Sequence, residues 1–371
     1  MRALIDYRPA LRERTGIGEY THELVRALAS GIAPSDLDIS VFSSSWKDRL
    51  EIREAGFERV GRVDRRWPVR TLNAAWHRLE WPAVEILTGE DFDVVQSMTP
   101  LLVPTRRAAQ VITIADLSFL RDSTWTRAEV RRDYPTLIHS HARRADAIVV
   151  MSRYVAGEVE RVLNIDPSRI AVVEPGAPAW TARPAPPPHG HVLFVGTLEP
   201  RKNVGVLLDA FEHLVTRTRV ELVLAGKSTP AAERWLERTR KPPLAGRVRH
   251  LGYVDADQRR GLYEGASVLV LPSLDEGFGL PVLEAMTLGV PVVVSNRGSL
   301  PEVVGDAGAI VDANDPQALA DAIERVLRDE AYASACVSKG LARSREYRWD
   351  RAAERTYAVY QQAVARRCAS A

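Results

Sequence analysis

Short runs of apolar residues alternate with longer amphipathic segments along almost the whole chain. Runs rich in Val and Ile that show no strict apolar–polar alternation are typical of parallel strands buried on both faces. In the first half, strands are expected at residues 2–6, 38–43, 93–98, 110–116, 147–152 and 170–176. Helix-like segments such as residues 18–30 fall between most of them. This order predicts repeated strand–helix units built on a parallel sheet.

The pattern breaks once, at "PGAPAWTARPAPPPHGH", residues 175–191, which contains six prolines and is expected to be a linker. The alternation then restarts, with strands expected at residues 191–196, 220–226, 248–254, 266–273, 290–295 and 308–312. The class is therefore α/β, with two doubly wound, Rossmann-like parallel-sheet domains.

The predicted boundaries are residues 1–180 for the first domain, 175–191 for the linker and 191–346 for the second domain. The last helix-like segment, residues 347–371, is expected to pack back across the cleft between the domains. Ligands of such sheets bind at the carboxyl ends of the strands, so the cleft is the natural site.

Composition narrows the class of protein only slightly. The 371 residues are 46% hydrophobic and 26% charged, and the formal net charge is +2, which gives no reason to expect nucleic acid as a partner. Cys336 and Cys368 form no C-x-x-C motif, which favours a reducing compartment. Neither an apolar leader nor a run of about 18 apolar residues is present, so a cytoplasmic protein is expected.

One stretch combines several features of a ligand-binding site: "DEGFGLPVLEAMTLGVPVVVS", residues 275–295. The two glycines at its start permit backbone that other residues avoid, and Pro281 suits the first turn of a helix. The N-terminus of such a helix attracts phosphate. Glu284, one turn into the helix, is suited to accept two hydroxyl groups, and Glu276, on the loop, to bind another polyol or to steady a developing cation. The alternative is a pair of solvated surface acids.

The same stretch, with its two glutamates spaced as E-x7-E, resembles the signature of retaining GT-B glycosyltransferases of the glycosyltransferase 4 family. Further resemblances cover most of the chain, at residues 16–28, 114–126, 195–211, 251–273, 299–308 and 348–360. The resemblance implies that Glu284 binds the ribose of a nucleotide sugar and Glu276 the transferred sugar. It also implies that the backbone of Phe278, Gly279 and Leu280 lies against sugar and phosphate.

Two cations follow the strand expected at residues 191–196. Arg201 and Lys202, in "EPRKN", suit a diphosphate, although an ordinary charged loop is the alternative reading. By resemblance they neutralise the pyrophosphate leaving group. Some relatives carry Arg directly after the glycine of this strand, where this chain has Thr197, so more of the charge falls on Arg201 and Lys202.

The first domain contributes fewer candidates. Gly16 and Gly18 form a lone G-x-G, which by itself is only a flexible turn, but by resemblance this loop faces the phosphates. In "TIADLSFL", many relatives have a histidine where this chain has Ala115. Asp116 is then the candidate catalytic group that replaces it, or else a strand-end residue that caps the following turn.

The remaining predictions concern the base, metals and membranes. Backbone groups near Tyr253 and Val254 are expected to read the base. No histidine pair or Asp-x-Asp pair is placed to hold a metal near the cleft, so no cofactor and no metal are expected. Residues 59–81 are basic at their start and contain Trp67, Trp76 and Trp81, which suggests contact with anionic lipid; a buried helix with a charged flank is the alternative.

The sequence thus predicts a retaining, metal-independent glycosyltransferase that moves a sugar, with GDP-mannose as the first choice of donor. The expected acceptor is a growing bacterial polysaccharide or lipid-linked glycan, such as O-antigen or capsule, at the inner face of the cell membrane. Alternatives are another donor (UDP-glucose, UDP-N-acetylglucosamine or dTDP-rhamnose), a non-catalytic nucleotide-sugar-binding protein, or a hydrolase that uses Glu276 and Glu284 as an acid–base pair.

Overall fold

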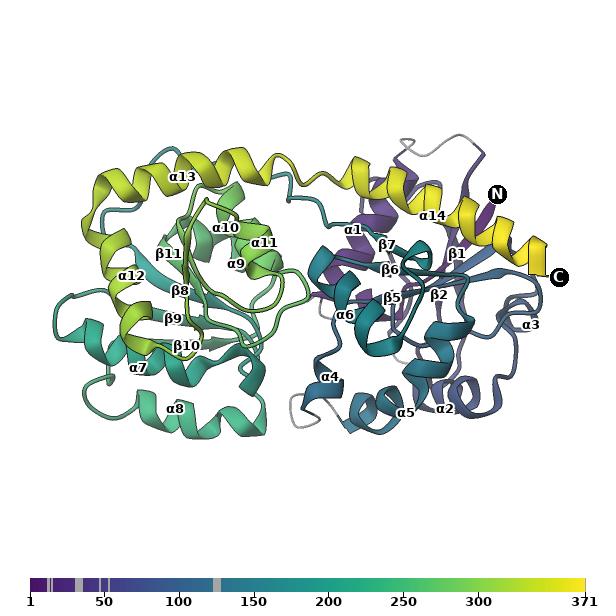
Figure 1. Ribbon diagram of the computed structural model, residues 1–371, viewed down its shortest axis with the longest axis horizontal. Helices are drawn as coiled ribbons and strands as arrows, with labels where there is room; N and C mark the ends of the chain where they lie inside the picture. The colour runs from purple at the N-terminus through teal and green to yellow at the C-terminus, as the bar shows by residue number, and fades with distance from the viewer. Residues whose placement is uncertain are drawn as a thin grey trace. The chain divides into compact units, whose positions relative to one another are not determined.

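The computed structural model describes residues 1–11, 14, 16–30, 36–46, 48–52, 54–122 and 128–370. It divides into two compact units, Met1–Gly176 with Arg348–Ala371, and Ala177–Tyr347 (Figure 1). Residues 123–126, the end of one family-like segment in the first half, lie outside the described residues. Each unit is described by itself below.

The first unit is built on a seven-stranded parallel sheet with the strand order β3-β2-β1-β4-β5-β6-β7. The strands are β1 (Arg2–Asp6), β2 (Asp38–Ser43), β3 (Gly61–Asp64), β4 (Val94–Ser97), β5 (Ala109–Ile114), β6 (Ala147–Val150) and β7 (Ile170–Val172). The helices are η1 (Arg8–Ala10), α1 (Ile17–Ala29), α2 (Val69–Leu79), α3 (Val84–Thr88), α4 (Ser118–Arg121), α5 (Ala128–Arg144), α6 (Arg153–Leu163), η3 (Pro167–Arg169) and α14 (Trp349–Ser370). All six strands predicted for this half of the chain are present.

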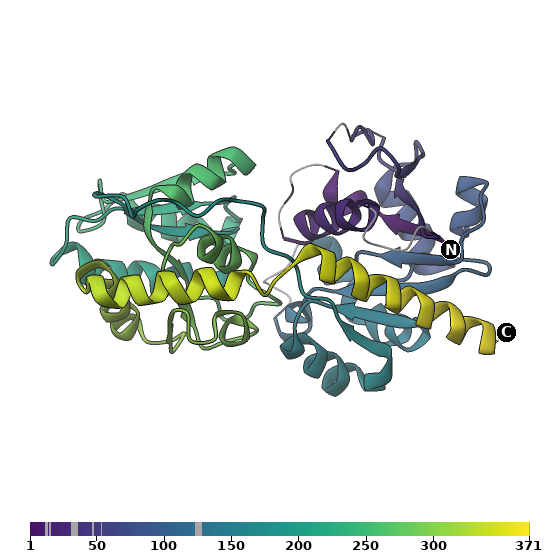
Figure 2. The same cartoon turned by 90° about the horizontal axis from the view of Figure 1, so that it is seen from above.

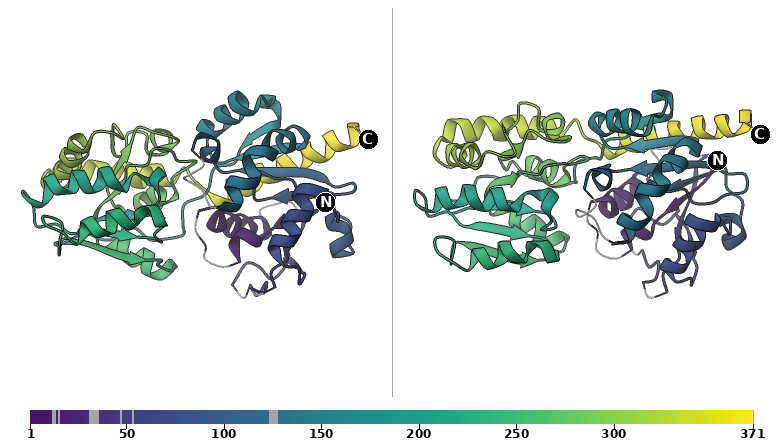
Figure 3. Two further views of the ribbon diagram at one scale, coloured as in Figure 1. Left: turned by 90° about the horizontal axis from the view of Figure 1, so that it is seen from below. Right: turned by 60° about the horizontal axis from the view of Figure 1, so that its bottom comes forward.

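The second unit has a six-stranded parallel sheet with the strand order β10-β9-β8-β11-β12-β13. Its strands are β8 (His191–Val195), β9 (Leu222–Ala225), β10 (Val248–Gly252), β11 (Ala266–Leu271), β12 (Val292–Ser295) and β13 (Ala309–Val311). Its helices are η4 (Pro200–Lys202), α7 (Val204–Val215), η5 (Pro230–Ala232), α8 (Glu233–Thr239), α9 (Ala256–Glu264), α10 (Leu280–Thr287), α11 (Leu300–Val304), α12 (Pro316–Arg328) and α13 (Glu330–Ser344). Figure 3 shows helices on both faces of this sheet.

Burial on both faces explains why the strands appear as continuous apolar runs. Every residue of β12 is buried, as is every residue of β9, and the valines and leucines of β11 lie beneath helices on either side. Burying one such side chain contributes about 1.5–3 kcal/mol to stability, so side-chain packing stabilises these strands although they are short. The predicted pair of Rossmann-like parallel-sheet domains is confirmed.

The final helix, α14, belongs to the first unit, against which it lies in Figure 2. It packs on α1 and β5. The buried Tyr360 hydroxyl donates to Gln96 Oε1 at 2.5 Å, and the Trp349 ring lies 5.8 Å from that of Tyr20. One hydrogen bond and one aromatic contact therefore tie α14 to β4 and to α1.

Residues 178–190, the proline-rich segment, contain no helix or strand, and they lie along the second unit. Arg183 Nη1 donates to the carbonyl oxygens of Glu264 and Ala266, at 3.2 and 2.5 Å. The Trp180 ring lies 6.1 Å from that of Tyr263. This segment is thus packed in place along its first half.

The basic segment at residues 59–81 differs from what the sequence suggested. It contains the edge strand β3, which was not predicted, and the whole of α2. Trp76 is a core residue: it packs on Phe42 at 5.6 Å between ring centroids, and its indole N–H donates to Pro82 O at 2.9 Å. Its inclusion among interfacial tryptophans was wrong, whereas Trp67 and Trp81 are exposed.

The described helices include none that is long and apolar enough to cross a membrane.

The contact between Gly176 and α14 can be tested by adding one methyl group. A Cβ at position 176 would lie 2.3 Å from Trp349 N and 2.5 Å from the Trp349 ring, so the backbone must shift. We expect Gly176→Ala to destabilise the first unit by about 1–3 kcal/mol, which differential scanning calorimetry would register as a lower melting temperature.

The matched control is Gly157→Ala in α6, where a Cβ would have no neighbour within 4 Å. Alanine favours the helix there by about 0.5–1 kcal/mol, so this variant should melt slightly higher than the native protein. Equal melting temperatures for the two variants would show that Trp349 does not restrict position 176.

Candidate active site

A strand–turn–helix unit in the second unit forms the centre of the site. β11 ends at Leu271, and the loop that follows leads into α10 through Gly279, which has φ +100°. Only glycine adopts this conformation readily, and a Cβ there would also lie 2.9 Å from Leu300 Cδ2. Pro281 occupies the first turn of α10, as the sequence predicts. Phe278 is buried edge-on against Tyr347, with ring centroids 5.5 Å apart.

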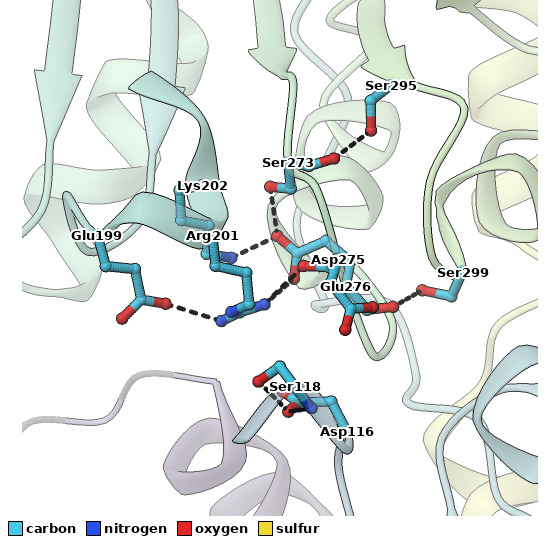
Figure 4. A network of polar contacts seen from close by, with 10 residues as sticks. All are labelled: Asp116, Ser118, Glu199, Arg201, Lys202, Ser273, Asp275, Glu276, Ser295 and Ser299. Atoms are coloured by element: carbon cyan, nitrogen blue, oxygen red, sulfur yellow. Dashed lines mark hydrogen bonds and ion pairs between the residues drawn. The ribbon is translucent and has the colours of Figure 1, made fainter. Parts of the chain in front are cut away.

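Glu276 lies on this loop and is buried among donors (Figure 4). Its Oε1 accepts hydrogen bonds from Lys202 Nζ and from Ser273 Oγ, the latter at 2.8 Å. Its Oε2 lies 3.3 Å from Arg201 Nη1. The backbone oxygen of Glu276 accepts from both the N–H and the hydroxyl of Ser299, at 3.0 Å each. The carboxylate is therefore fixed in orientation from several sides.

Arg201 and Lys202 come from η4, directly after β8, and the structure brings both predicted cations to Glu276. Arg201 also donates from Nη1 to Asp275 O at 2.8 Å and from Nη2 to Glu199 Oε1 at 2.9 Å. Both cationic side chains are largely buried, with 14% and 11% of their surface exposed. An ordinary charged loop would leave them in solvent, so that reading does not fit.

Glu276, Arg201 and Lys202 form a cluster in which each charge stabilises the others. Burial by itself raises the pKa of the Glu276 carboxyl, but Lys202 and Arg201 outweigh burial, and the pKa lies below its ordinary value. A carboxyl with a lowered pKa is ionised at neutral pH and stabilises the fold at any pH above its ordinary value. That contribution is lost only as the pH falls through the lowered value.

Glu284 is buried on α10, and its partners come from α9. The Tyr263 hydroxyl donates to Glu284 Oε2 at 2.7 Å, and Arg259 Nη2 lies 3.1 Å from Oε1. Burial, together with the neighbouring carboxylate, raises the pKa of Tyr263 well above its ordinary value. Neither Glu276 nor Glu284 is a solvated surface acid, because both side chains are at least nine-tenths buried.

Other predicted residues of the second unit lie after its strands and at the start of α10, although the strand predicted to reach residue 254 ends at Gly252. Tyr253 and Val254 directly follow β10. Tyr253 is 38% exposed, and Lys227 Nζ lies 5.7 Å from the centroid of its ring. Leu280 is the first residue of α10. Because the sheet is parallel, the carboxyl ends of β8, β10 and β11 lie at one edge of the sheet. The predicted site residues of the second unit therefore lie at that edge.

The predicted residues of the first unit have structural partners of their own. Gly16 precedes α1 with φ +50°, and a Cβ on Gly18 would lie 2.6 Å from Pro9 O, so glycine lets α1 approach η1 closely. Asp116 Oδ1 accepts from the Ser118 N–H at 3.0 Å and from its hydroxyl at 2.6 Å. This geometry is that of the turn-capping alternative, and a catalytic role for Asp116 stays a prediction.

Sequence reasoning missed the residues that hold the two glutamates, namely Ser273, Ser299, Arg259 and Tyr263. Arg259 and Tyr263 are four residues apart, and therefore on one face of α9, which was the available signal. The two serines gave none, because serine is ordinary at strand ends and before short helices. The residues described in the structure include no group of three or more metal-ligating side chains that could hold an ion.

Solved structures resemble the whole chain. Sucrose-phosphate synthase from Thermosynechococcus elongatus is 22% identical and has a TM-score of 0.76, with 97% of this chain and 98% of that chain covered. HepE from Anabaena, solved in complex with UDP-glucose, is 16% identical and has a TM-score of 0.66, with both chains covered completely. With its two parallel-sheet units, the chain therefore has the GT-B fold of glycosyltransferases.

Sequence comparison narrows the class to a family. Residues 14–179 match Glycosyltransferase Family 4, and residues 189–329 match Glycosyl transferases group 1. The O-antigen chain mannosyltransferase B of Escherichia coli is 30% identical over 391 aligned positions, which cover 97% of this chain and 99% of that protein. The chain therefore belongs to glycosyltransferase family 4, and it is a glycosyltransferase.

The hydroxyl of Tyr263 can be removed without changing the shape of the ring. Tyr263→Phe leaves the buried Glu284 carboxylate without one donor, and a hydrogen bond to a charged group contributes about 1.5–3 kcal/mol. We expect the free energy of unfolding of the second unit, measured by chemical denaturation, to fall by that amount.

Tyr357→Phe is the matched control, because its hydroxyl also donates to a carboxylate, that of Asp36 at 3.1 Å, but at the surface. Stability should be nearly unchanged there, since exposed pairs contribute little. A loss at Tyr263 no larger than that at Tyr357 would contradict a supporting role for the Tyr263 hydroxyl.

Proposed function

We propose that the enzyme transfers mannose from GDP-mannose, with retention of anomeric configuration and without a metal, to a hydroxyl of a growing bacterial polysaccharide or lipid-linked glycan. The observation that carries the proposal is the buried cluster of Arg201, Lys202 and Glu276 beside the N-terminus of α10. The name of the full-length E. coli relative, an O-antigen chain mannosyltransferase, supports the choice of sugar and acceptor. We further propose a cytoplasmic enzyme that works at the inner face of the membrane.

In the proposed reaction, the cations serve the leaving group. The bond between the anomeric carbon and the phosphate oxygen breaks as negative charge grows on the diphosphate, and Arg201, Lys202 and the first N–H groups of α10 neutralise that charge. The sugar passes through a cation-like state, which the Glu276 carboxylate stabilises. The acceptor hydroxyl attacks from the face that the diphosphate leaves, and the departing phosphate oxygen takes its proton.

The remaining residues bind the donor. Glu284, held by Tyr263 and Arg259, is proposed to accept the ribose hydroxyls, since an ionised carboxylate has about four acceptor positions and each of its oxygens can take more than one donor. The backbone of residues 278–280 lies along sugar and phosphate, and residues 253–254 meet the base. Gly16 and Gly18 are proposed to approach the phosphates, and Asp116 to contribute to transfer, from the first unit.

Glu276 also bears on affinity for the product. Without donor, it is the counter-charge of Lys202 and Arg201, so a diphosphate competes with this carboxylate for the two cations. The same competition weakens binding of the diphosphate left after transfer, which favours its release. Glu276 would then serve both the bond-breaking step and turnover.

Calorimetric binding of GDP and guanosine tests the phosphate role. Arg201→Ala or Lys202→Ala should weaken GDP binding about 10- to 100-fold, the equivalent of one charge-assisted hydrogen bond, and leave guanosine binding unchanged. Glu276→Gln should tighten GDP binding while transfer falls, because the cations lose their competitor. The exposed Lys241 supplies the control variant, Lys241→Ala, which should bind both ligands normally.

Equal effects on GDP and guanosine would place Arg201 and Lys202 outside the phosphate site. Weaker GDP binding by Glu276→Gln would mean that this carboxylate supports the diphosphate rather than competing with it.

The donor, the stereochemistry and the metal independence are tested together. Among GDP-mannose, UDP-glucose, UDP-N-acetylglucosamine and dTDP-rhamnose, GDP-mannose should raise the melting temperature most, in a concentration-dependent way. Transfer should continue in EDTA, and NMR of the product's anomeric proton should show the configuration of the donor.

A larger shift with another nucleotide sugar would replace the donor and leave the reaction class intact. An inverted product would overturn the mechanism. Binding without transfer to any glycan acceptor would favour a non-catalytic nucleotide-sugar-binding protein.

A further inference from the structure

Two exposed tryptophans follow neighbouring strands of the first unit. β2 and β3 pair in parallel with Ser43 opposite Asp64, and each strand ends at that residue. Trp46 and Trp67 come three residues after these strand ends, and they are 64% and 40% exposed. Both tryptophans therefore lie at the carboxyl edge of the first sheet, which is the edge where ligands of parallel sheets bind.

Hydrogen bonds join the two connections that carry these tryptophans. The N–H of Arg65 donates to Ser43 O at 2.9 Å, and the N–H of Trp67 donates to Arg65 O at 3.1 Å. The chain that leaves β2 also returns to the end of β3, because the N–H of Leu50 donates to Asp64 Oδ2 at 3.2 Å. The turn with Trp46 and the segment with Trp67 are thus held against the same two strand ends.

The aliphatic side chains of this surface are covered, whereas its two indole rings are not. Leu50 and Ile52, from the connection after β2, are buried. Arg49 Nη2 lies 2.8 Å from Asp64 Oδ2, which places an ion pair at the end of β3. The two tryptophans are the large hydrophobic side chains found exposed among the described residues of both connections, which are 44–46, 48–52, 54–60 and 65–68.

Flat aromatic rings beside charged groups suit a carbohydrate. One face of a sugar ring presents C–H groups, which stack on the electron-rich face of an indole, and its hydroxyls bond to carboxylates and guanidinium groups such as those of Asp64 and Arg49. A bilayer would also take up aliphatic side chains, and here these are covered. Two rings are too few for a stable protein interface, which buries about 800 Å² on each partner.

The strand order separates these rings from the residues proposed to take part in transfer. β2 lies next to β1, which leads to Gly16 and Gly18, and β3 lies one strand further out. Neighbouring strands are about 4.8 Å apart, so β3 lies about 10 Å from β1. Asp116 follows β5, on the other side of β1. The sugar that reacts cannot also reach Trp67, but later sugars of the same chain can.

We propose that Trp46 and Trp67 form a distal acceptor subsite, in which their rings stack on sugars of the growing glycan that lie away from the reacting hydroxyl. This subsite raises the affinity for long acceptors and does not touch the reacting atoms. Long chains are therefore extended in preference to short ones. The inference rests on the glycan acceptor proposed above and is independent of the donor.

Binding of α-linked oligomannosides to the full chain tests the subsite, with saturation-transfer NMR as the readout and no donor present. The native chain should bind a hexamer about 25-fold more tightly than a dimer. Trp46→Ala and Trp67→Ala should each weaken hexamer binding about fivefold, and the double variant about 25-fold, since separate contacts add in free energy. Dimer binding and the melting temperature should not change.

The shape of the replacement side chain distinguishes a sugar from a lipid. Trp46→Phe keeps a flat ring and should retain most of the hexamer affinity. Trp46→Leu keeps an apolar side chain without a flat face, so it should lose as much affinity as Trp46→Ala. A lipid surface would accept leucine in place of tryptophan.

Trp81→Ala is the matched control, because Trp81 is 59% exposed but lies between α2 and α3, in the connection that leads to the amino end of β4. It should bind both oligomers like the native chain. Equal affinity of the native chain for dimer and hexamer, or native hexamer binding by the double variant, would overturn the inference. So would loss of binding to anionic vesicles by Trp46→Ala with unchanged hexamer binding, which would assign the ring to a lipid surface.

The same variants keep the subsite separate from the proposed function. GDP binding, and the kcat of transfer from GDP-mannose to the dimer, should stay at the native level in the double variant. Transfer to the dimer without any preference for longer acceptors would refute the subsite alone, whereas loss of both activities in the native chain would refute the proposed donor and acceptor as well.

Discussion

The second unit is organised around one buried ion cluster. Glu276, Lys202 and Arg201 come from two different strand–helix connections, and none of them would tolerate burial alone, because an unpaired buried charge is strongly unfavourable. Their mutual neutralisation is what permits charged groups to sit beneath the loop before α10. Ser273 and Ser299 complete the arrangement by bonding the carboxylate and the backbone of Glu276. Because the charges of this cluster already balance, the proposed donor diphosphate would only replace one anion by another, with little reorganisation.

Two glycines, Gly298 and Gly279, lie where the chain packs closely around the loop before α10. Gly298 has φ +63°, and a Cβ there would lie 2.5 Å from Glu276 N, so the chain after β12 passes directly over the loop that carries the carboxylate. Gly279 turns the chain into α10 at a point where Leu300 leaves no room for a side chain. The two glycines therefore serve close approach as much as flexibility, and Gly298 lets the chain pass directly against the backbone of Glu276.

The sequence was most informative where burial imposes a pattern. Apolar runs marked twelve of the strands because most of their residues are buried, and the E-x7-E spacing across a glycine turn marked the candidate site. β3 was missed because an edge strand is half solvated, and its "GRVD" carries only one valine among charges. Arg259 and Tyr263 were missed for a related reason. Helix α9 is rich in charged residues, so the sequence does not show that Arg259 and Tyr263 face inward. Their role becomes visible only when the position of Glu284 is known. Trp76 shows the converse error, in which a basic neighbourhood hid a core residue.

The packing of the proline-rich segment decides how domain exchanges among relatives should be made. Its Trp180 leans on Tyr263, which holds Glu284, and its Arg183 ties down the carbonyls at the end of α9. A chimera joined at residue 191, where the second sheet begins, would place the proline-rich segment of another protein against the native α9. The contact between Trp180 and Tyr263, which supports Glu284, would then be lost. A junction at residue 176, with a second one at 348 so that α14 travels with the first unit, exchanges each unit together with all the chain that packs on it.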